Sequence, residues 1–168
     1  MRLLLPLLLF THLLAAKDSL TVYLFLLDEC RISQEMTPYI NEIYSRYKTQ
    51  AGFIGAFPNK ATHKDNMQAF AAKYSIRFPL VLDHEKVLAK RWKATILPEV
   101  VLYNERTQQI VYRGLINDLY LKPGKRRYFI KNHYLASALE AALAGREVSV
   151  KETRPVGCFI NFQENSND

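Results

Sequence analysis

Two cysteines, Cys30 and Cys158, are the residues of this chain with the most distinctive chemistry, and the sequence holds no other cysteine. Cys30 follows an apolar run at residues 20–27 and an acidic pair, Asp28-Glu29, and it precedes a segment with helical spacing. A thiol at the amino end of a helix is placed to react, because the helix dipole and the unpaired amides of the first turn favour thiolate over thiol. Cys158 lies far along the chain, in a Gly-Cys-Phe-Ile segment. The central question is whether these two sulfurs meet.

The amino terminus has the pattern of a secretory signal peptide. Met1-Arg2 supplies a positive charge, residues 3–14 are almost wholly apolar, and Leu14-Ala15-Ala16 has the small residues of a cleavage site. The apolar run is shorter than the roughly 20 residues that cross a bilayer, so we expect a cleaved signal at residues 1–16 rather than an anchor. Export to a periplasm or the extracellular space would place the chain where disulfides persist. Two cysteines there favour a redox pair over metal ligands.

The remaining chain has the size and composition of one domain, which we expect at residues 17–162, followed by a polar tail at residues 163–168. The formal net charge is +7, and the densest basic run is at residues 122–127, beside Tyr128 and Phe129. Such a run could bind nucleic acid by phosphate contacts and stacking. In an exported protein a solvated loop is favoured, so we expect no nucleic acid partner. The histidines are isolated, and we expect no metal site and no cofactor.

Alternating strand and helix patterns indicate an α/β sandwich. Residues 20–27 are apolar almost throughout, as in a central strand covered on both faces. Apolar residues recur at helical spacing over residues 33–50, and Gly52 ends that pattern. The other expected elements are a strand at 53–57, a helix at 64–74, a buried strand at 78–82, a short helix through Val87, Leu88 and Trp92 that Asp83 caps, a hairpin of 99–103 and 109–114, and a helix at 134–144 that ends at Gly145.

Four stretches together resemble a known family: residues 26–33 (Leu-Leu-Asp-Glu-Cys-Arg-Ile-Ser), Leu97-Pro98-Glu99, residues 111–118 (Val-Tyr-Arg-Gly-Leu-Ile-Asn-Asp), and residues 134–145 with 152–160. They resemble the active-site turn, the cis-proline segment, the hairpin and the terminal helix of exported thioredoxin-like redoxins, also described as thiol-disulfide isomerase-like domains. The resemblance implies a central mixed β-sheet flanked by helices, here with a shortened amino-terminal region. It also implies that the Leu97–Pro98 bond is cis and lies against the sulfur of Cys30, where the backbone could pair with an extended peptide. The bond could otherwise be trans at the start of a strand.

The chain departs from the family pattern at the second cysteine. Ser33 stands where a Cys-x-x-Cys pair would have its partner, so Cys30 cannot form the vicinal disulfide. An outside thiol or a distant cysteine must then resolve a mixed disulfide, and Cys158 is the candidate within the chain. Glu99 is a candidate for tuning or proton relay, and Arg31 could offset the acidic pair beside Cys30. A peroxiredoxin requires a proline and a threonine or serine shortly before its reactive cysteine, to hold and polarise peroxide. Three positions before Cys30 this chain has Leu27.

The sequence therefore predicts an exported, monomeric thiol-disulfide oxidoreductase. Cys30 would attack, Cys158 would resolve, Pro98 would shape the substrate site, and protein thiols or disulfides and an external reductant would be the partners. Three alternatives stay open: a non-catalytic binding or adaptor module with a permanent Cys30–Cys158 disulfide, a weak thiol peroxidase, and two thiols that never meet because their Cα atoms are more than about 7 Å apart.

Overall fold

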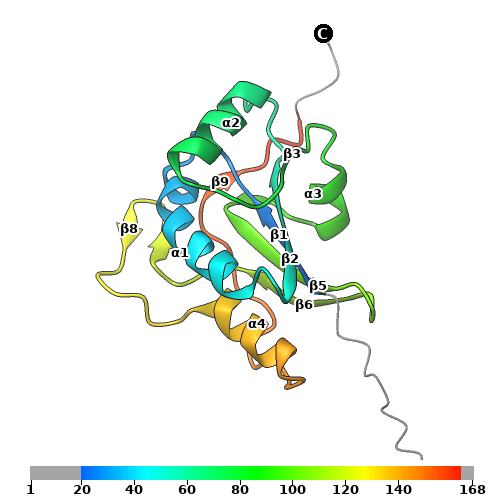
Figure 1. Cartoon of the computed structure of the whole chain (residues 1–168). Coiled ribbons are helices and arrows are strands. Elements are labelled where there is room, and N and C mark those ends of the chain that lie inside the picture. The colour runs from blue at the N-terminus through cyan, green and yellow to red at the C-terminus, as the bar shows by residue number, and fades with distance from the viewer. Residues whose placement is uncertain (1–19, 164–168) are drawn as a thin grey trace, which may run out of the picture.

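A mixed sheet of five strands, in the order β3-β2-β1-β5-β6, forms the centre of the part of the chain that the structure describes, residues 20–163 (Figure 1). The structure is a computed structural model. The predicted signal peptide lies outside the described residues, as does the tail after Gln163. The strands of this sheet are β1 (Leu20–Phe25), β2 (Ala51–Phe57), β3 (Leu80–Leu82), β5 (Glu99–Asn104) and β6 (Gln109–Gly114).

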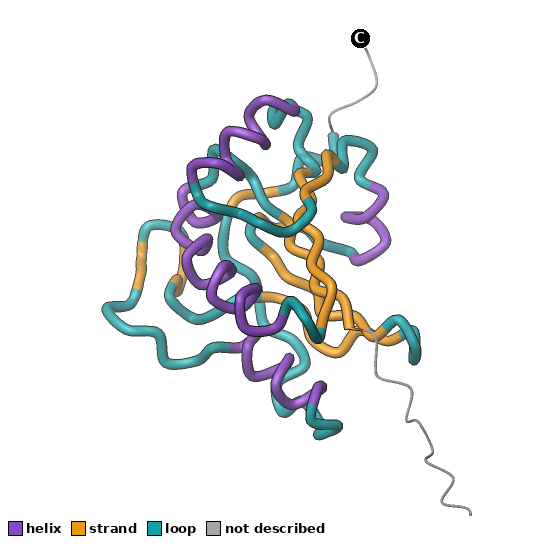
Figure 2. Tube along the Cα trace, in the orientation of Figure 1, coloured by secondary structure: helices purple, strands orange, loops and turns teal. Residues whose placement is uncertain are grey.

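β1 is the central strand of this sheet, as its apolar sequence predicts. It runs parallel to β2 and antiparallel to β5. Alternate side chains enter two cores, with Val22 and Leu24 on one face and Tyr23 and Phe25 on the other. The first face is covered by α1 (Arg31–Tyr47), α2 (Lys64–Lys73) and α4 (Tyr134–Leu143), and the second by α3 (Val87–Trp92). Figure 2 shows the helices in purple around the orange strands. The predicted α/β fold with a mixed sheet is confirmed.

α1 begins directly after Cys30 and ends at Tyr47, two residues earlier at its start and three earlier at its end than its pattern predicts. Pro38 lies inside this helix. Proline has no N–H to donate to the carbonyl four residues before it, which is that of Gln34. The hydroxyl of Thr37 donates to the Gln34 carbonyl instead, at 2.7 Å. The Thr37 side chain thus supplies the hydrogen bond that the Gln34 carbonyl oxygen cannot receive from Pro38.

β3 corrects the prediction of a buried strand at residues 78–82. The strand is only three residues long, and it is an edge strand that pairs with β2 alone. Val81 and Leu82 are 37% and 36% exposed, whereas Phe78, before the strand, is buried in the core. Pro79 separates the two parts, and proline is tolerated at a sheet edge because it cannot donate to a ladder.

Short elements complete the fold. The carboxylate of Asp83 accepts hydrogen bonds from the amides of Leu88 and Ala89, which confirms it as the cap of α3. Gly145 follows α4 with φ +66°, as expected of a residue that ends a helix. No helix within residues 20–163 has the length and apolar character needed to span a membrane.

Two two-stranded ribbons are formed by β4 (Ile96–Leu97) with β9 (Cys158–Phe159), and by β7 (Tyr120–Lys122) with β8 (Lys125–Arg126).

The chain after α4 returns across the sheet to reach the start of α1. It first runs beside β6, where the Arg113 amide donates to the Lys151 carbonyl and the Thr153 amide donates to the Arg113 carbonyl. It then forms β9 (orange to red in Figure 1). We call residues 151–161 the C-terminal arm. This path brings the end of the described chain to the junction of β1 and α1.

Candidate active site

The two cysteine sulfurs are in contact. The Sγ of Cys158 lies 2.7 Å from the Sγ of Cys30 and donates a hydrogen bond to it, although 128 residues separate them in sequence. Both are free thiols in this structure. The Sγ of Cys30 in turn donates to the carbonyl oxygen of Leu97, at 3.3 Å. The arrangement excludes the alternative of two thiols that never meet.

Cys30 is held by the rigid centre of the fold. It is the residue before α1, its amide donates to the Leu27 carbonyl, and its carbonyl accepts the Gln34 amide of the first helical turn. Its side chain packs in the main core and the residue is only 2% exposed. The predicted strand-to-helix junction is therefore present, with the free amides of the first turn of α1 beside the sulfur.

Cys158 is held by the C-terminal arm. It pairs with Leu97 in the β4–β9 ribbon, and it is partly exposed. Gly157 permits this pairing, because a Cβ at that position would lie 1.9 Å from the Leu97 carbonyl oxygen. On the other side of the arm, the Asn59 side chain donates to the Phe159 carbonyl at 3.2 Å and accepts from the Asn161 amide at 2.9 Å.

The sequence pattern did not predict a role for Asn59, or the close approach of the two backbones at Gly157. Asn59 lies in the loop after β2, a position at which nothing in the local pattern marks a tertiary contact. Gly157 stands in the Gly-Cys segment, and the glycine beside the cysteine was the available signal. Both residues position Cys158 rather than reacting themselves.

The Leu97–Pro98 bond is cis, which confirms the prediction from the resemblance. Leu97 contacts both cysteines, because its carbonyl oxygen accepts a hydrogen bond from Cys30 and its backbone pairs with that of Cys158. The strand edge beside the proline is thus occupied by the chain's own β9. Pro98 itself lines a small cavity with Ile32 and Met36, on the side of α1.

Ser33 is fully buried in the first turn of α1, and its Oγ accepts the Leu27 amide at 3.3 Å. This bond joins the start of the helix to the segment after β1. Among the described residues, no ion pair joins Arg31 to Asp28 or Glu29. The Arg31 side chain is 84% exposed and forms an ion pair with Glu35 at 2.7 Å. Asp28 accepts a hydrogen bond from the hydroxyl of Thr62.

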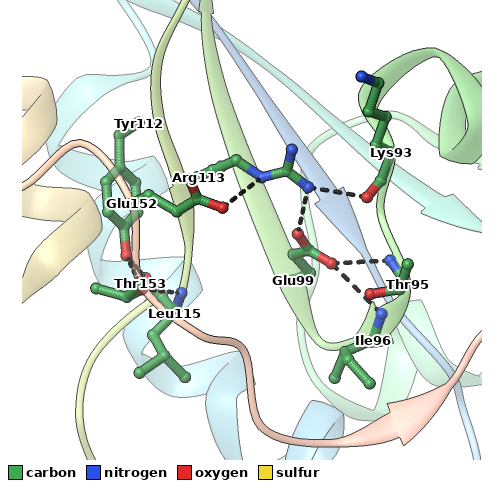
Figure 3. A network of polar contacts seen from close by, with 9 residues as sticks. All are labelled: Lys93, Thr95, Ile96, Glu99, Tyr112, Arg113, Leu115, Glu152 and Thr153. Carbon is green, nitrogen blue, oxygen red and sulfur yellow. Dashed lines mark hydrogen bonds and ion pairs between the residues drawn. The ribbon is translucent and has the colours of Figure 1, made fainter.

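Glu99 lies on the opposite face of the sheet from Cys30. Its neighbours in β5 alternate between the two cores, with Val100 on the face of Cys30 and Val101 on the face of α3. The carboxylate is 2% exposed and accepts from Arg113 at 3.1 Å and from the amides of Thr95 and Ile96 at 3.0 and 3.4 Å (Figure 3). Among the described residues, no hydrogen bond joins it to either sulfur.

Arg113 connects this network to the C-terminal arm. Its guanidinium also donates to the Lys93 carbonyl at 2.8 Å and lies 3.6 Å from the carboxylate of Glu152 (Figure 3). In the same view, the hydroxyl of Thr153 contacts the Tyr112 hydroxyl and accepts the Leu115 amide. The network therefore fixes both the loop that carries β4 and the start of the arm.

The environment of the two sulfurs favours a protonated Cys158. Burial, and then the hydrogen bond to Cys30, raise the pKa of the Cys158 thiol to about 12. At neutral pH Cys158 therefore keeps its proton and offers it to the sulfur of Cys30. No group of three or more His, Cys, Asp and Glu side chains in residues 20–163 could hold a metal ion.

Comparison with known proteins shows what this chain is similar to. No family model matches the chain. A curated relative, the thiol-disulfide oxidoreductase ResA of Geobacillus kaustophilus (strain HTA426), is 30% identical over 84 residues, which are 49% of this chain and 48% of the relative. The chain thus spans about half the length of the curated relative that it matches.

Solved structures share most of the architecture. A crystal structure of a hypothetical protein from Sinorhizobium meliloti 1021 has a TM-score of 0.78 at 21% identity, over 89% of this chain and 82% of that chain. A solution structure of a thioredoxin-like protein in the oxidized form has a TM-score of 0.58 at 16% identity, over 77% of this chain and 81% of that chain. These likenesses show the fold. With the mixed sheet and its strand order, they show that the chain has a thioredoxin-like fold.

Proposed function

We propose that this protein is a thiol-disulfide oxidoreductase that exchanges disulfides with other proteins through Cys30 and Cys158. The observation that carries the proposal is the contact of the two sulfurs at the amino end of α1, against the carbonyl of Leu97. Two thiols at this separation can become a disulfide after a small movement. The name of the curated relative supports the same class of reaction.

In the reducing direction, the thiolate of Cys30 attacks one sulfur of a substrate disulfide, and the other substrate sulfur leaves as a thiolate. Cys158 then attacks the sulfur of Cys30 in the mixed disulfide, which forms a Cys30–Cys158 disulfide and releases the second substrate thiol. Because its pKa is raised, Cys158 gives up its proton as it attacks, and the departing substrate thiolate accepts that proton. An external dithiol reductant then restores both thiols.

The arm must move during this cycle. Cys30 is buried beneath Cys158, so a substrate disulfide reaches its sulfur only when the arm shifts. The arm is suited to this because β9 is two residues long. Pro98 and Leu97 shape the surface that receives the substrate, Ser33 leaves Cys30 without a neighbouring resolving thiol, and Glu99 positions the loop before the proline.

Export of the mature chain belongs to the same proposal. It rests on the sequence pattern of residues 1–16, and it would place the cysteine pair in a compartment where disulfides form and persist.

A permanent bridge within a binding module is the second candidate, and the burial of Cys30 favours it. Intact mass after alkylation, measured across a graded series of dithiol and disulfide buffers, distinguishes the two. We expect a bridge that opens at a mild potential, whereas a structural disulfide resists all but strong reductant. A bridge that never opens under mild conditions would favour the binding module.

Matched serine variants assign the roles of the two sulfurs. We expect Cys158→Ser to hold a protein substrate as a long-lived mixed disulfide on Cys30, visible on a non-reducing gel, and Cys30→Ser to hold none. The reverse pattern would exchange the two roles, and the absence of mixed disulfides from both variants would contradict the exchange reaction.

A further inference from the structure

The strand edge beside the cis-proline is closed by the chain itself. β9 pairs with β4 in antiparallel register, Leu97 opposite Cys158, and Gly157 allows the two backbones to approach closely. A substrate peptide cannot add to this edge while β9 is in place. A substrate must therefore first bind on another side of the two sulfurs, before the arm shifts and exposes Cys30.

An open cleft reaches both sulfurs from the side of the β7–β8 ribbon. Cys30 and Cys158 line a cavity of about 350 Å³, which Pro123 and Arg126 of the ribbon also line. Tyr120, Pro123 and Gly157 also line a second cavity, of about 760 Å³, between the ribbon and the C-terminal arm. The shared residues show that the two cavities adjoin, and we call the pair the cleft. Together they offer more room than a single side chain requires, enough for a segment of a protein.

The charges along the cleft are mostly positive. Its one lining carboxylate, Asp118, is already engaged by the amides of Lys131 and Asn132 and by Arg127 at 3.4 Å. Two cations near the sulfurs, Arg31 and Arg126, share Glu35. That carboxylate also accepts from the Tyr120 hydroxyl at 2.6 Å, and its pKa is lowered by this bond and by the arginines.

Two cations in the wider cavity are left without a carboxylate. Lys122 on β7 and Arg154 on the C-terminal arm are exposed and face the same cavity. Within residues 20–163 neither forms an ion pair with an acidic side chain. Leu121 and Phe159, which are 43% and 77% exposed, add apolar surface between them. A surface of this kind complements a segment that carries acidic side chains together with apolar ones.

We propose that this cleft, between the β7–β8 ribbon and the C-terminal arm, is the substrate entrance, and that it selects extended protein segments with acidic side chains beside their disulfide. The inference rests on the proposed exchange reaction and adds its substrate class. Lys122 and Arg154 are specificity-determining residues, which attract the segment but take no part in the exchange of sulfur bonds.

The test uses two synthetic peptides of equal length. Each has one cysteine, joined as a mixed disulfide to an aromatic thiol that is coloured when released, and the cysteine is flanked by Glu in one peptide and by Lys in the other. Attack by the reduced protein on the peptide sulfur forms a protein–peptide disulfide and expels the aromatic thiolate. We expect the second-order rate constant to be about tenfold larger for the acidic peptide at low ionic strength, with the difference shrinking as salt is added.

Charge reversal locates the preference. The variant Lys122→Glu with Arg154→Glu should lose the preference for the acidic peptide or reverse it. A matched control, Arg46→Glu with Lys48→Glu, changes net charge equally at the other end of α1, about 25 Å from Cys30, and should keep the preference. Both pairs are exposed, and thermal unfolding followed by circular dichroism confirms that both variants fold.

Each result is decisive. Equal rates for the two peptides with the unaltered protein would overturn the selectivity but leave the exchange reaction standing. An equal loss of the preference for the acidic peptide in the control variant would assign that preference to net charge and overturn the role of the cleft. No release of thiolate from either peptide would overturn the exchange reaction and, with it, this inference.

Discussion

The two sulfurs of the site are carried by two very different regions. Cys30 belongs to the β1–α1 junction, which lies in the main core between a central strand and a helix of 17 residues. Cys158 belongs to an arm that is attached near the sulfur by a two-residue strand and by the side chain of Asn59. One sulfur is thus fixed by the fold and the other by a few local contacts. A cysteine pair that must open to admit a substrate requires that difference.

The largest expected effect comes from the fixed region. Glu99→Gln removes the charge of a buried carboxylate and leaves the half-buried Arg113 with Glu152 as its remaining acidic partner; the loss of one partner of a buried ion pair costs about 3–5 kcal/mol, and the lower end applies here. We expect a global loss of that order in the free energy of unfolding, measured by urea denaturation. The pH profile of the exchange rate should keep its shape. A shifted profile would instead support the predicted proton relay through Glu99.

A smaller effect, confined to the arm, is expected from Gly157→Ala. The added Cβ would meet the backbone of Leu97, so β9 must move away from β4. We expect the Cys30–Cys158 disulfide to form less readily in a graded redox buffer, while the unfolding free energy falls by only about 1–3 kcal/mol. Gly52→Ala is the control, because its Cβ would meet nothing nearer than 3.5 Å. Unchanged bridging in Gly157→Ala would contradict the need for close approach.

Asn59→Ala tests the other attachment of the arm and should have a smaller effect. The change removes two hydrogen bonds, each with a typical net contribution of about 1 kcal/mol. Amide hydrogen exchange should become faster at residues 157–161 and stay unchanged in β1. Faster exchange throughout β1 would mean that the arm and the core open together, which would remove the contrast between the two regions.

The last expected effect is absent at neutral pH and appears only in alkali, as a dependence of the unfolding free energy on the ionisation of Cys158. The pKa of Cys158 is about 12 in the folded protein, against about 8.5 for an unperturbed thiol. A group whose folded pKa is raised contributes stability fully below the unfolded value and loses it as the pH rises towards the folded value. Stability should therefore decline between about pH 8.5 and 12, and Cys158→Ser should decline less. Equal slopes of the unfolding free energy against pH in the unaltered protein and in Cys158→Ser would show that Cys158 ionises as readily in the folded chain as in the unfolded one.

The sequence predicted the elements that carry long patterns. The apolar run of β1, the spacing of α1 and the Asp83 cap each depend on neighbouring residues, and each is confirmed. The cis-proline followed from the family resemblance and is confirmed as well. The pairing of β4 with β9 could not be predicted, because strands of two residues have no periodicity to read. The face of Glu99 was missed because it depends on the register of β5, which tertiary pairing sets.

The separation of the two cysteines has a consequence for the synthesis of the protein. Cys30 is translated 128 residues before Cys158, and the arm that carries Cys158 follows the strands of the sheet and α4 in the chain. Contacts so distant in sequence slow folding, because the entropy cost of closing the loop precedes any gain from the contact. The thiol of Cys30 is therefore made before anything covers it. Bridging of the pair would report that folding has reached the end of the domain.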